Sequence, residues 1–258
     1  SIGRLIEVHS VLNETPTKRN PSPCWPAVGE LHCGHEILAL LGRGAFSRVY
    51  LARQIELGNR LVVTKFTASF SDEANLLGPM CHPAIMPVYS VQQQAEHGLT
   101  LIVMPFRGIS TLLDILDRYR NLAVAPRYAA DIVRPVSRPT GSLLAHQFPV
   151  ENDELPLPAF DSYFDWVLSV GRTLAEALEY VHARGIWHRD IKPSNILLSW
   201  NGRPLLMDFN LAQTRDAMVH NEGGTLAYMP PERLRSFGES QPESAANREA
   251  EDMFALGV

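Results

Sequence analysis

Three polar residues suited to phosphoryl transfer stand at short spacings in the C-terminal half of the chain. Asp190 and Asn195 lie in the stretch 188–195, and Asp208 follows after a further apolar run. One carboxylate can orient a hydroxyl group, while an amide oxygen and a second carboxylate are hard ligands of the kind that Mg²⁺ prefers. These residue types predict phosphoryl transfer to an alcohol, with Asp190 at the hydroxyl and Asn195 and Asp208 at the metal.

A glycine-bearing hairpin is the second candidate element. Gly42 and Gly44 lie between two expected strands, where they let the backbone pass close to phosphates and offer N–H groups to them. A tight hairpin without any catalytic role would also favour glycine, so this pattern leaves both interpretations open. Lys65 ends the following expected strand and could reach the phosphates, and Glu73 is the candidate to pair with its ammonium group.

The elements expected to hold these residues change in type along the chain. Residues 1–33 are rich in proline and polar residues, which predicts a linker or a poorly ordered lead-in. Short β-branched runs then predict antiparallel strands at 37–41, 48–52, 61–66, 86–91 and 99–104, and residues 72–80 read as a short helix. After Gly108 the pattern is helical, with one apolar stripe formed by Phe164, Val167, Val170, Leu174, Leu178 and Val181.

The composition excludes several classes of function. The chain has 258 residues, is 45% apolar and carries a net charge of −5 with both signs mixed, so it can form a core and is expected to bind no nucleic acid. Three cysteines are too few for a disulfide framework and favour a cytoplasmic setting. The chain begins without Met and stops within an apolar pattern, so we expect a fragment that makes no membrane contact itself. A membrane span beyond Val258, which would place the protein at the cytoplasmic face, is left open.

In its motifs and their order along the chain, the protein resembles the Ser/Thr protein kinases, and in particular the eukaryotic-like kinases of bacteria. The motifs that carry the resemblance run from about residue 36 to the C-terminus, and they are the glycine hairpin, Lys65, Glu73, His82-Pro83, Met104-Pro105-Phe106-Arg107, the stretch 188–195, Asp208-Phe209, Gly224-Thr225 and Pro230-Pro231-Glu232. The resemblance implies an α+β, two-lobed protein-kinase-like fold for residues 34–258. A small antiparallel β-sheet lobe would occupy about 34–104, a hinge about 105–108, and a mainly helical, C-terminally truncated lobe 109–258, with an insertion at about 118–160.

The resemblance also implies roles for individual residues, with ATP and Mg²⁺ as cofactors and a protein as the substrate. Lys192 would neutralise charge on the transferring phosphoryl group. The stretch 188–195 would be the catalytic loop, and Asp252 would brace its backbone. Thr225 would help to dock the substrate, and both Lys192 and Thr225 favour Ser or Thr as the acceptor. His188 and Phe209 would stack on each other. The positions implied for ATP binding are Leu41, Gly42, Gly44, Val49, Lys65, Met104, Phe106 and Arg107.

Departures from the family's pattern keep a second hypothesis open. Seven residues separate Lys65 from Glu73, a much shorter spacing than is usual, Asn210 stands where a glycine is typical, and Pro105 in the hinge has no N–H. The alternative is a pseudokinase that acts as a nucleotide-binding or protein-interaction module. The retained lysine, aspartates and asparagine of the motifs favour the active enzyme. The segment 118–160 is expected to be a solvated surface insertion, with a docking site for a partner as the alternative.

Overall fold

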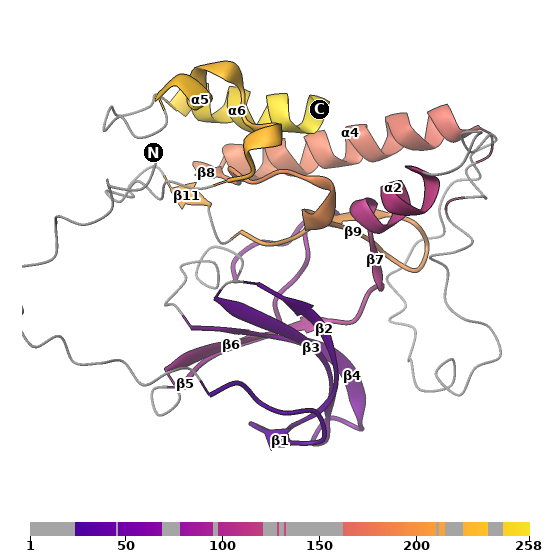
Figure 1. Cartoon of the computed structure of the whole chain (residues 1–258), viewed down its shortest axis with the longest axis vertical. Coiled ribbons are helices and arrows are strands. Elements are labelled where there is room, and N and C mark those ends of the chain that lie inside the picture. Colours follow the sequence, from indigo (N-terminus) through magenta and orange to yellow (C-terminus); the bar gives the residue numbers. More distant parts are fainter. Residues whose placement is uncertain are drawn as a thin grey trace, which may run out of the picture.

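The protein forms a β-rich lobe and a mainly helical lobe, which lie at the bottom and the top of Figure 1. This computed structural model confirms the expected α+β, two-lobed protein-kinase-like fold. The residues that the structure describes are 24–44, 46–68, 78–94, 98–120, 128, 132, 162–209, 212–214, 224–236 and 245–258.

The β-rich lobe is built on a six-stranded antiparallel sheet with the strand order β1-β2-β3-β4-β6-β5. Alternate side chains of a strand face opposite sides of the sheet, and one face carries a buried cluster that includes Ile37, Tyr50, Val62 and Phe66. Because β1 pairs with β2, the sheet begins slightly before the expected domain start at residue 34. The strands are β1 (Leu31–His32), β2 (His35–Arg43), β3 (Ser47–Gln54), β4 (Arg60–Thr67), β5 (Ser90–Gln94) and β6 (Leu99–Pro105).

The expected strand at 86–91 is wrong for its first residues, because β5 begins only at Ser90. Pro87 has no N–H to donate to a ladder. Met86 instead donates its N–H to the carbonyl of Leu206 in the helical lobe, at 2.8 Å. The expected helix at 72–80 lies mostly outside the described residues, and Gly78 begins a turn, so no helix continues to Met80.

The long helix of the second lobe, α4 (Tyr163–His182), is capped by Ser162. The Ser162 hydroxyl accepts the N–H of Asp165 and donates to its carboxylate, which is a reciprocal cap of the kind that fixes a helix start. The expected apolar stripe is correct from Val170 onward but wrong in the first turns, where Phe164 is 75% exposed and Trp166 is buried. Trp166 precedes Val170 by one helical turn, as Val167 does, so periodicity alone could not choose between them.

The described part of this lobe also contains the α-helices α2 (Leu112–Arg120), α5 (Pro231–Ser236) and α6 (Ala245–Gly257). The first residues of the expected insertion, 118–120, therefore belong to a helix, and Ile132 within it is buried in the core. Most of the remaining insertion lies outside the described residues. Among the helices that the structure describes, none is long and apolar enough to cross a membrane.

Within the described residues, five short strands that the sequence patterns did not predict form the framework around the stretch 188–195 and Asp208. β7 (Ser110–Thr111), β9 (Ile196–Leu198) and β10 (Pro204–Leu206) form one sheet, and β8 (Ile186–Trp187) pairs with β11 (Gln213–Thr214). The stretch 188–195 connects β8 to β9, and Asp208 follows β10. β9 and β10 are buried in the core against α4. The stretch 188–195 therefore ends, and the segment with Asp208 begins, on backbone that the core holds in place.

Candidate active site

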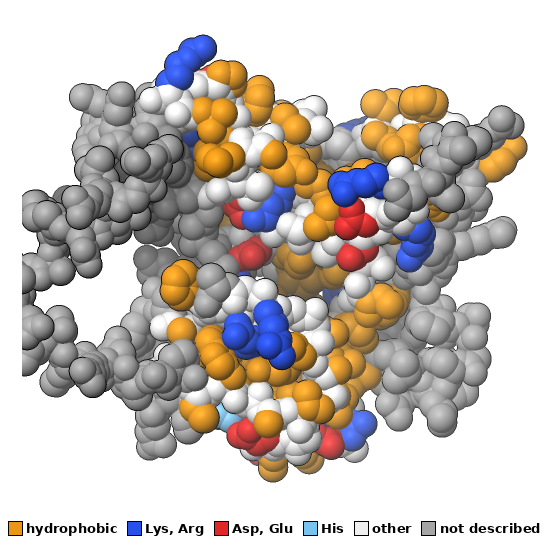
Figure 2. All heavy atoms as spheres, in the orientation of Figure 1, with side chains coloured by type: hydrophobic (Ala, Val, Ile, Leu, Met, Phe, Trp, Pro, Cys, Tyr) orange, Lys and Arg blue, Asp and Glu red, His pale blue; other side chains and the backbone are white. Residues whose placement is uncertain are grey.

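A cleft of about 550 Å³ lies between the glycine hairpin and β4 on one side and β9 and the end of β10 on the other. Figure 2 shows the surface hollowed between the two lobes, with acidic and basic side chains on the edge that the helical lobe forms. All the positions implied for ATP binding line this cleft except Phe106, and Asp208 lines it as well. The residues expected to bind the nucleotide, apart from Phe106, therefore line one cleft.

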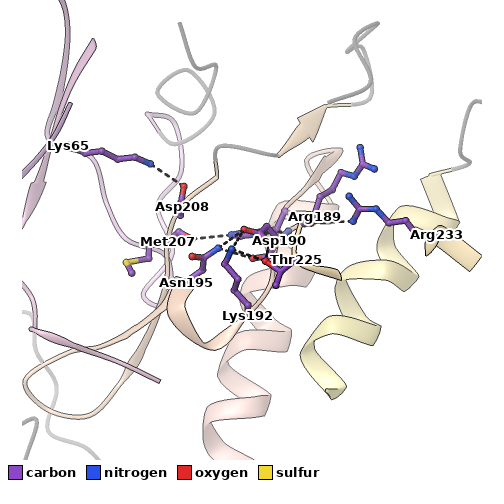
Figure 3. A network of polar contacts seen from close by, with 10 residues as sticks. Lys65, Arg189, Asp190, Lys192, Asn195, Met207, Asp208, Thr225 and Arg233 are labelled. Atoms are coloured by element: carbon purple, nitrogen blue, oxygen red, sulfur yellow. Dashed lines mark hydrogen bonds and ion pairs between the residues drawn. The ribbon is translucent and has the colours of Figure 1, made fainter. Parts of the chain in front are cut away.

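Lys65 reaches across the cleft from β4 to Asp208, with 3.1 Å between the Lys65 Nζ and Asp208 Oδ1 atoms (Figure 3). Lys65 is 5% exposed, and its backbone is paired with Val49 on one side and Ile102 on the other. A buried ammonium group requires a counter-charge, and Asp208 supplies one. Glu73, the expected partner of Lys65, lies outside the described residues.

The backbone around Asp208 is held in a left-handed turn, with φ of +67°. The N–H of Met207 donates to the carbonyl of Asn195 at 3.0 Å, and the Met207 carbonyl lies 3.1 Å from His188 Nε2. Phe209 is fully buried and packs edge to face against the His188 ring with 4.6 Å between centroids, so the expected contact of the two rings is present. Met207 and Phe209 are thus anchored on either side of Asp208, which fixes its backbone. The Asp208 side chain lines the cleft.

The catalytic loop brings Asp190, Lys192 and Asn195 together with Thr225 (Figure 3). The Thr225 hydroxyl donates to Asp190 Oδ1 at 3.0 Å and accepts from Lys192 Nζ at 2.9 Å. Lys192 Nζ is also 2.6 Å from Asp190 Oδ2. A carboxylate and an ammonium group therefore hold one hydroxyl between them, which is the arrangement that an acceptor hydroxyl requires.

The donor groups around Asn195 and Asp208 fit a hard cation such as Mg²⁺. The Asn195 amide nitrogen donates to the Asp190 carbonyl at 2.9 Å and to its carboxylate at 3.1 Å. These bonds orient the amide so that its oxygen is the atom left for a ligand. With the Asp208 carboxylate, the site offers the oxygen ligands that Mg²⁺ prefers.

Asp252 on α6 braces the catalytic loop, as expected. Its carboxylate accepts the backbone N–H of His188 at 2.9 Å and of Arg189 at 2.7 Å, and it also lies 2.8 Å from His182 Nε2 on α4. Arg189 itself has a φ of +65°, an uncommon conformation for a residue with a side chain. The two hydrogen bonds to Asp252 oppose the cost of that conformation.

The end of the hinge is attached to the helical lobe through Trp200. The backbone N–H of Trp200 donates to the Arg107 carbonyl at 2.9 Å, and the Trp200 and Phe106 rings pack edge to face at 5.4 Å. A Cβ atom on Gly108 would lie 2.2 Å from the Leu198 carbonyl oxygen, so this close approach requires glycine. Phe106 therefore packs on Trp200 and does not line the cleft.

Two charged residues near the catalytic loop were not found from the sequence. Arg233 on α5 donates to the Arg189 carbonyl at 3.2 Å, and Glu251 on α6 lies 3.3 Å from the Arg233 guanidinium. Both are almost fully buried. No local pattern marks them, because their partners come from other elements of the fold.

Comparison with known proteins relates this chain to the protein kinases. Residues 166–258 match the model of the protein kinase domain. The chain is 28% identical over 237 residues to the DNA damage-responsive serine/threonine-protein kinase RqkA of Deinococcus radiodurans, covering 87% of this chain and 28% of that protein. It is 25% identical over 255 residues to the serine/threonine-protein kinase PknD of Chlamydia abortus, covering 87% of this chain and 23% of that protein.

The fold and the site together define a protein-kinase-like domain. Within that class the chain resembles the eukaryotic-like Ser/Thr protein kinases of bacteria, as its motifs indicate; a probable serine/threonine-protein kinase of Streptomyces coelicolor is likewise 28% identical over 222 residues, covering 78% of this chain and 27% of that protein. The family implies ATP as a substrate and typically Mg²⁺. The chain spans less than a third of the length of these relatives.

Proposed function

We propose that this protein transfers the γ-phosphoryl group of ATP to Ser or Thr hydroxyls of protein substrates. The observation that carries the proposal is the position of the Thr225 hydroxyl, which donates to Asp190 and accepts from Lys192. The site already holds an aliphatic hydroxyl between a carboxylate and an ammonium group. A substrate hydroxyl placed at the same carboxylate would lose its proton toward Asp190 as it attacks phosphorus.

Each of the other polar residues has a role that its contacts support. Lys192, at 2.6 Å from Asp190, would neutralise negative charge on the transferring group. Lys65 would pair with the α- and β-phosphates, since its ammonium group stands in the cleft beside Asp208. Asn195 and Asp208 would hold Mg²⁺, and the bound ion would supply positive charge at the phosphate oxygens.

The glycine hairpin and hinge would hold the nucleotide. Leu41 and Val49 provide apolar surface in the cleft, and Met104 lines it from β6. The Pro105 carbonyl and the Arg107 N–H are the backbone groups of the hinge that could meet adenine, because the Arg107 carbonyl is bonded to Trp200. We take residues 34–258 as the kinase domain, with Glu73 as a further candidate partner for Lys65.

The test is γ-phosphate transfer from ATP to a generic protein substrate, followed by identification of the phosphorylated amino acids. Asp190→Asn preserves the size of the side chain but removes the charge. We expect it to lower the rate of transfer by at least about a hundredfold. The matched control is Asp117→Asn on α2, since the Asp117 side chain is 54% exposed and forms a surface ion pair with Arg120.

Equal phosphate incorporation by the wild-type protein and Asp190→Asn would refute the assignment of Asp190. Nucleotide binding without any transfer by the wild-type protein would refute the proposed activity and would support the pseudokinase alternative. Phosphotyrosine as the sole product would refute the proposed acceptor class.

A further inference from the structure

Two arginine side chains and one carboxylate meet below the catalytic loop, where water is nearly excluded. The Glu251 Oε2 atom lies 3.3 Å from Arg233 Nη1 and 3.9 Å from Arg189 Nε. The side chains of Arg189, Arg233 and Glu251 are 8%, 6% and 4% exposed. Two guanidinium groups buried side by side repel each other unless a negative charge is placed between them, and Glu251 provides that charge.

The three residues come from three different elements. Arg189 belongs to the catalytic loop, Arg233 to α5 and Glu251 to α6. Figure 3 shows Arg189 and Arg233 extending toward each other beside Asp190 and Thr225. Glu251 thus links the catalytic loop to the helix that follows the segment bearing Thr225.

Arg233 contacts the backbone next to Asp190 and Thr225. Arg233 Nη1 donates to the Arg189 carbonyl at 3.2 Å, directly before Asp190 in the chain. Gly224 packs so closely that a Cβ atom there would lie 3.3 Å from the Arg189 carbonyl oxygen and 3.4 Å from Arg233 Nη2. Gly224 is followed by Thr225, whose hydroxyl donates to Asp190. A shift of Arg233 would therefore displace both members of that hydrogen bond.

We propose that Glu251 is a positioning residue for phosphoryl transfer, acting through Arg189 and Arg233 on Asp190 and Thr225. The inference rests on the proposed kinase function. Glu251 differs in role from its neighbour Asp252, which holds backbone N–H groups of the loop, because Glu251 balances side-chain charge. Its effect reaches Asp190 and Thr225, which would hold the acceptor hydroxyl, and does not extend to the nucleotide cleft, whose lining includes none of these three residues.

The experiment compares kcat and the KM for ATP in the wild-type protein, Glu251→Gln and Glu249→Gln. Glu249 lies on the same helix but is exposed, so it is the matched control. We expect Glu251→Gln to lower kcat about tenfold or more while the KM for ATP stays within about twofold. Glu249→Gln should match the wild-type protein in both constants. An unchanged kcat in a folded Glu251→Gln protein overturns the inference, as does a loss that appears only in the KM for ATP.

A second variant separates charge balance from simple loss of packing. Arg233→Met removes one buried cation but preserves an apolar side chain of similar length. In the Glu251→Gln background it should raise kcat above that of Glu251→Gln alone, whereas losses that multiply would overturn the inference. If Glu251→Gln does not fold, Glu251→Asp takes its place, because it keeps the charge but shortens the side chain. A kcat of Glu251→Asp equal to that of the wild-type protein then overturns the inference. Absence of transfer in the wild-type protein would instead refute the proposed function.

Discussion

The two sides of the candidate site are held together to different degrees. On the acceptor side, Asp190, Lys192, Asn195 and Thr225 are hydrogen-bonded to one another, and buried Asp252 fixes the loop beneath them. On the nucleotide side, the contact across the cleft between described residues that we can name is the ion pair of Lys65 with Asp208, and Phe46 near the tip of the glycine hairpin is 71% exposed. The acceptor side is thus arranged in advance, while the nucleotide side leaves room for the nucleotide to complete it.

This difference has a kinetic consequence. Groups that are fixed before binding act mainly on the chemical step, because they meet the substrate in the geometry of the transition state. Groups that close on the nucleotide contribute to its affinity. Substitutions on the acceptor side should therefore lower kcat, and substitutions on the nucleotide side should raise the KM for ATP.

The largest expected effect that tests this contrast is on the acceptor side, at Gly224. Gly224 has a φ of +126°, and a Cβ atom there would lie 2.8 Å from Met229 Cε and 3.3 Å from the Arg189 carbonyl oxygen. We expect Gly224→Ala to lower kcat about tenfold to a hundredfold. The strained backbone should also reduce the free energy of unfolding by about 1–3 kcal/mol. Steady-state kinetics and thermal unfolding measure the two effects.

Gly171→Ala is the matched control for that substitution. Gly171 lies inside α4, and apart from the backbone of its own helix and its chain neighbours a Cβ atom there would meet nothing within 4 Å. The change should stabilise the protein by about 0.5–1 kcal/mol, because alanine is the better helix former, and should leave kcat unaltered. A rise in the KM for ATP as the main effect of Gly224→Ala would contradict the division between the two sides.

The sequence predicted the acceptor side better than the framework around it. The residues at 188–195 are close in the chain, so their order alone brings most of the catalytic groups into one loop. Helical periodicity could not decide between Trp166 and Val167, since each lies one turn from Val170. The link between Arg189 and Glu251 joins a loop to a helix far away in the chain, and no local pattern encodes such a pairing.

The nucleotide side offers a smaller test, at Gly44. A Cβ atom on Gly44 would lie 2.6 Å from the Ser47 hydroxyl, the end of a side chain that can rotate away, and would project from the hairpin that lines the cleft. We expect Gly44→Ala to raise the KM for ATP by about threefold to tenfold with little change in kcat, because the added methyl group hinders the close approach of phosphates. Initial rates at varied ATP concentration measure this. A fall in kcat comparable to that of Gly224→Ala would show that both sides act on the chemical step.

The smallest expected effect is at His82, in the segment before β5, where its ring packs on Tyr180 of α4. Burial lowers the pKa of His82, with a smaller opposing influence from the carboxylate of Glu176 and a reinforcing one from Arg184. The folded protein therefore favours the neutral ring, and below the ordinary pKa of about 6.5 the unfolded chain takes up the proton first. Stability that is fully present above that pH is lost as the pH falls toward the lowered pKa.

His82→Asn should reduce this loss of stability on acidification. The His82 Nδ1 atom accepts the Ala84 N–H at 3.2 Å, and the asparagine side-chain oxygen can accept the same hydrogen bond without titrating. The measurement is the melting temperature at several pH values from about 7.5 down to about 5 for both proteins, since each contains the same other histidines. Asparagine loses the packing of the His82 ring on Tyr180, so the comparison is of slopes: relative to its own value at neutral pH, the wild-type protein should lose more stability on acidification than His82→Asn. Parallel curves would show that the neutral form of the His82 ring does not contribute to stability. The kcat and the KM for ATP at neutral pH should be unaffected, because His82 lies outside the cleft lining.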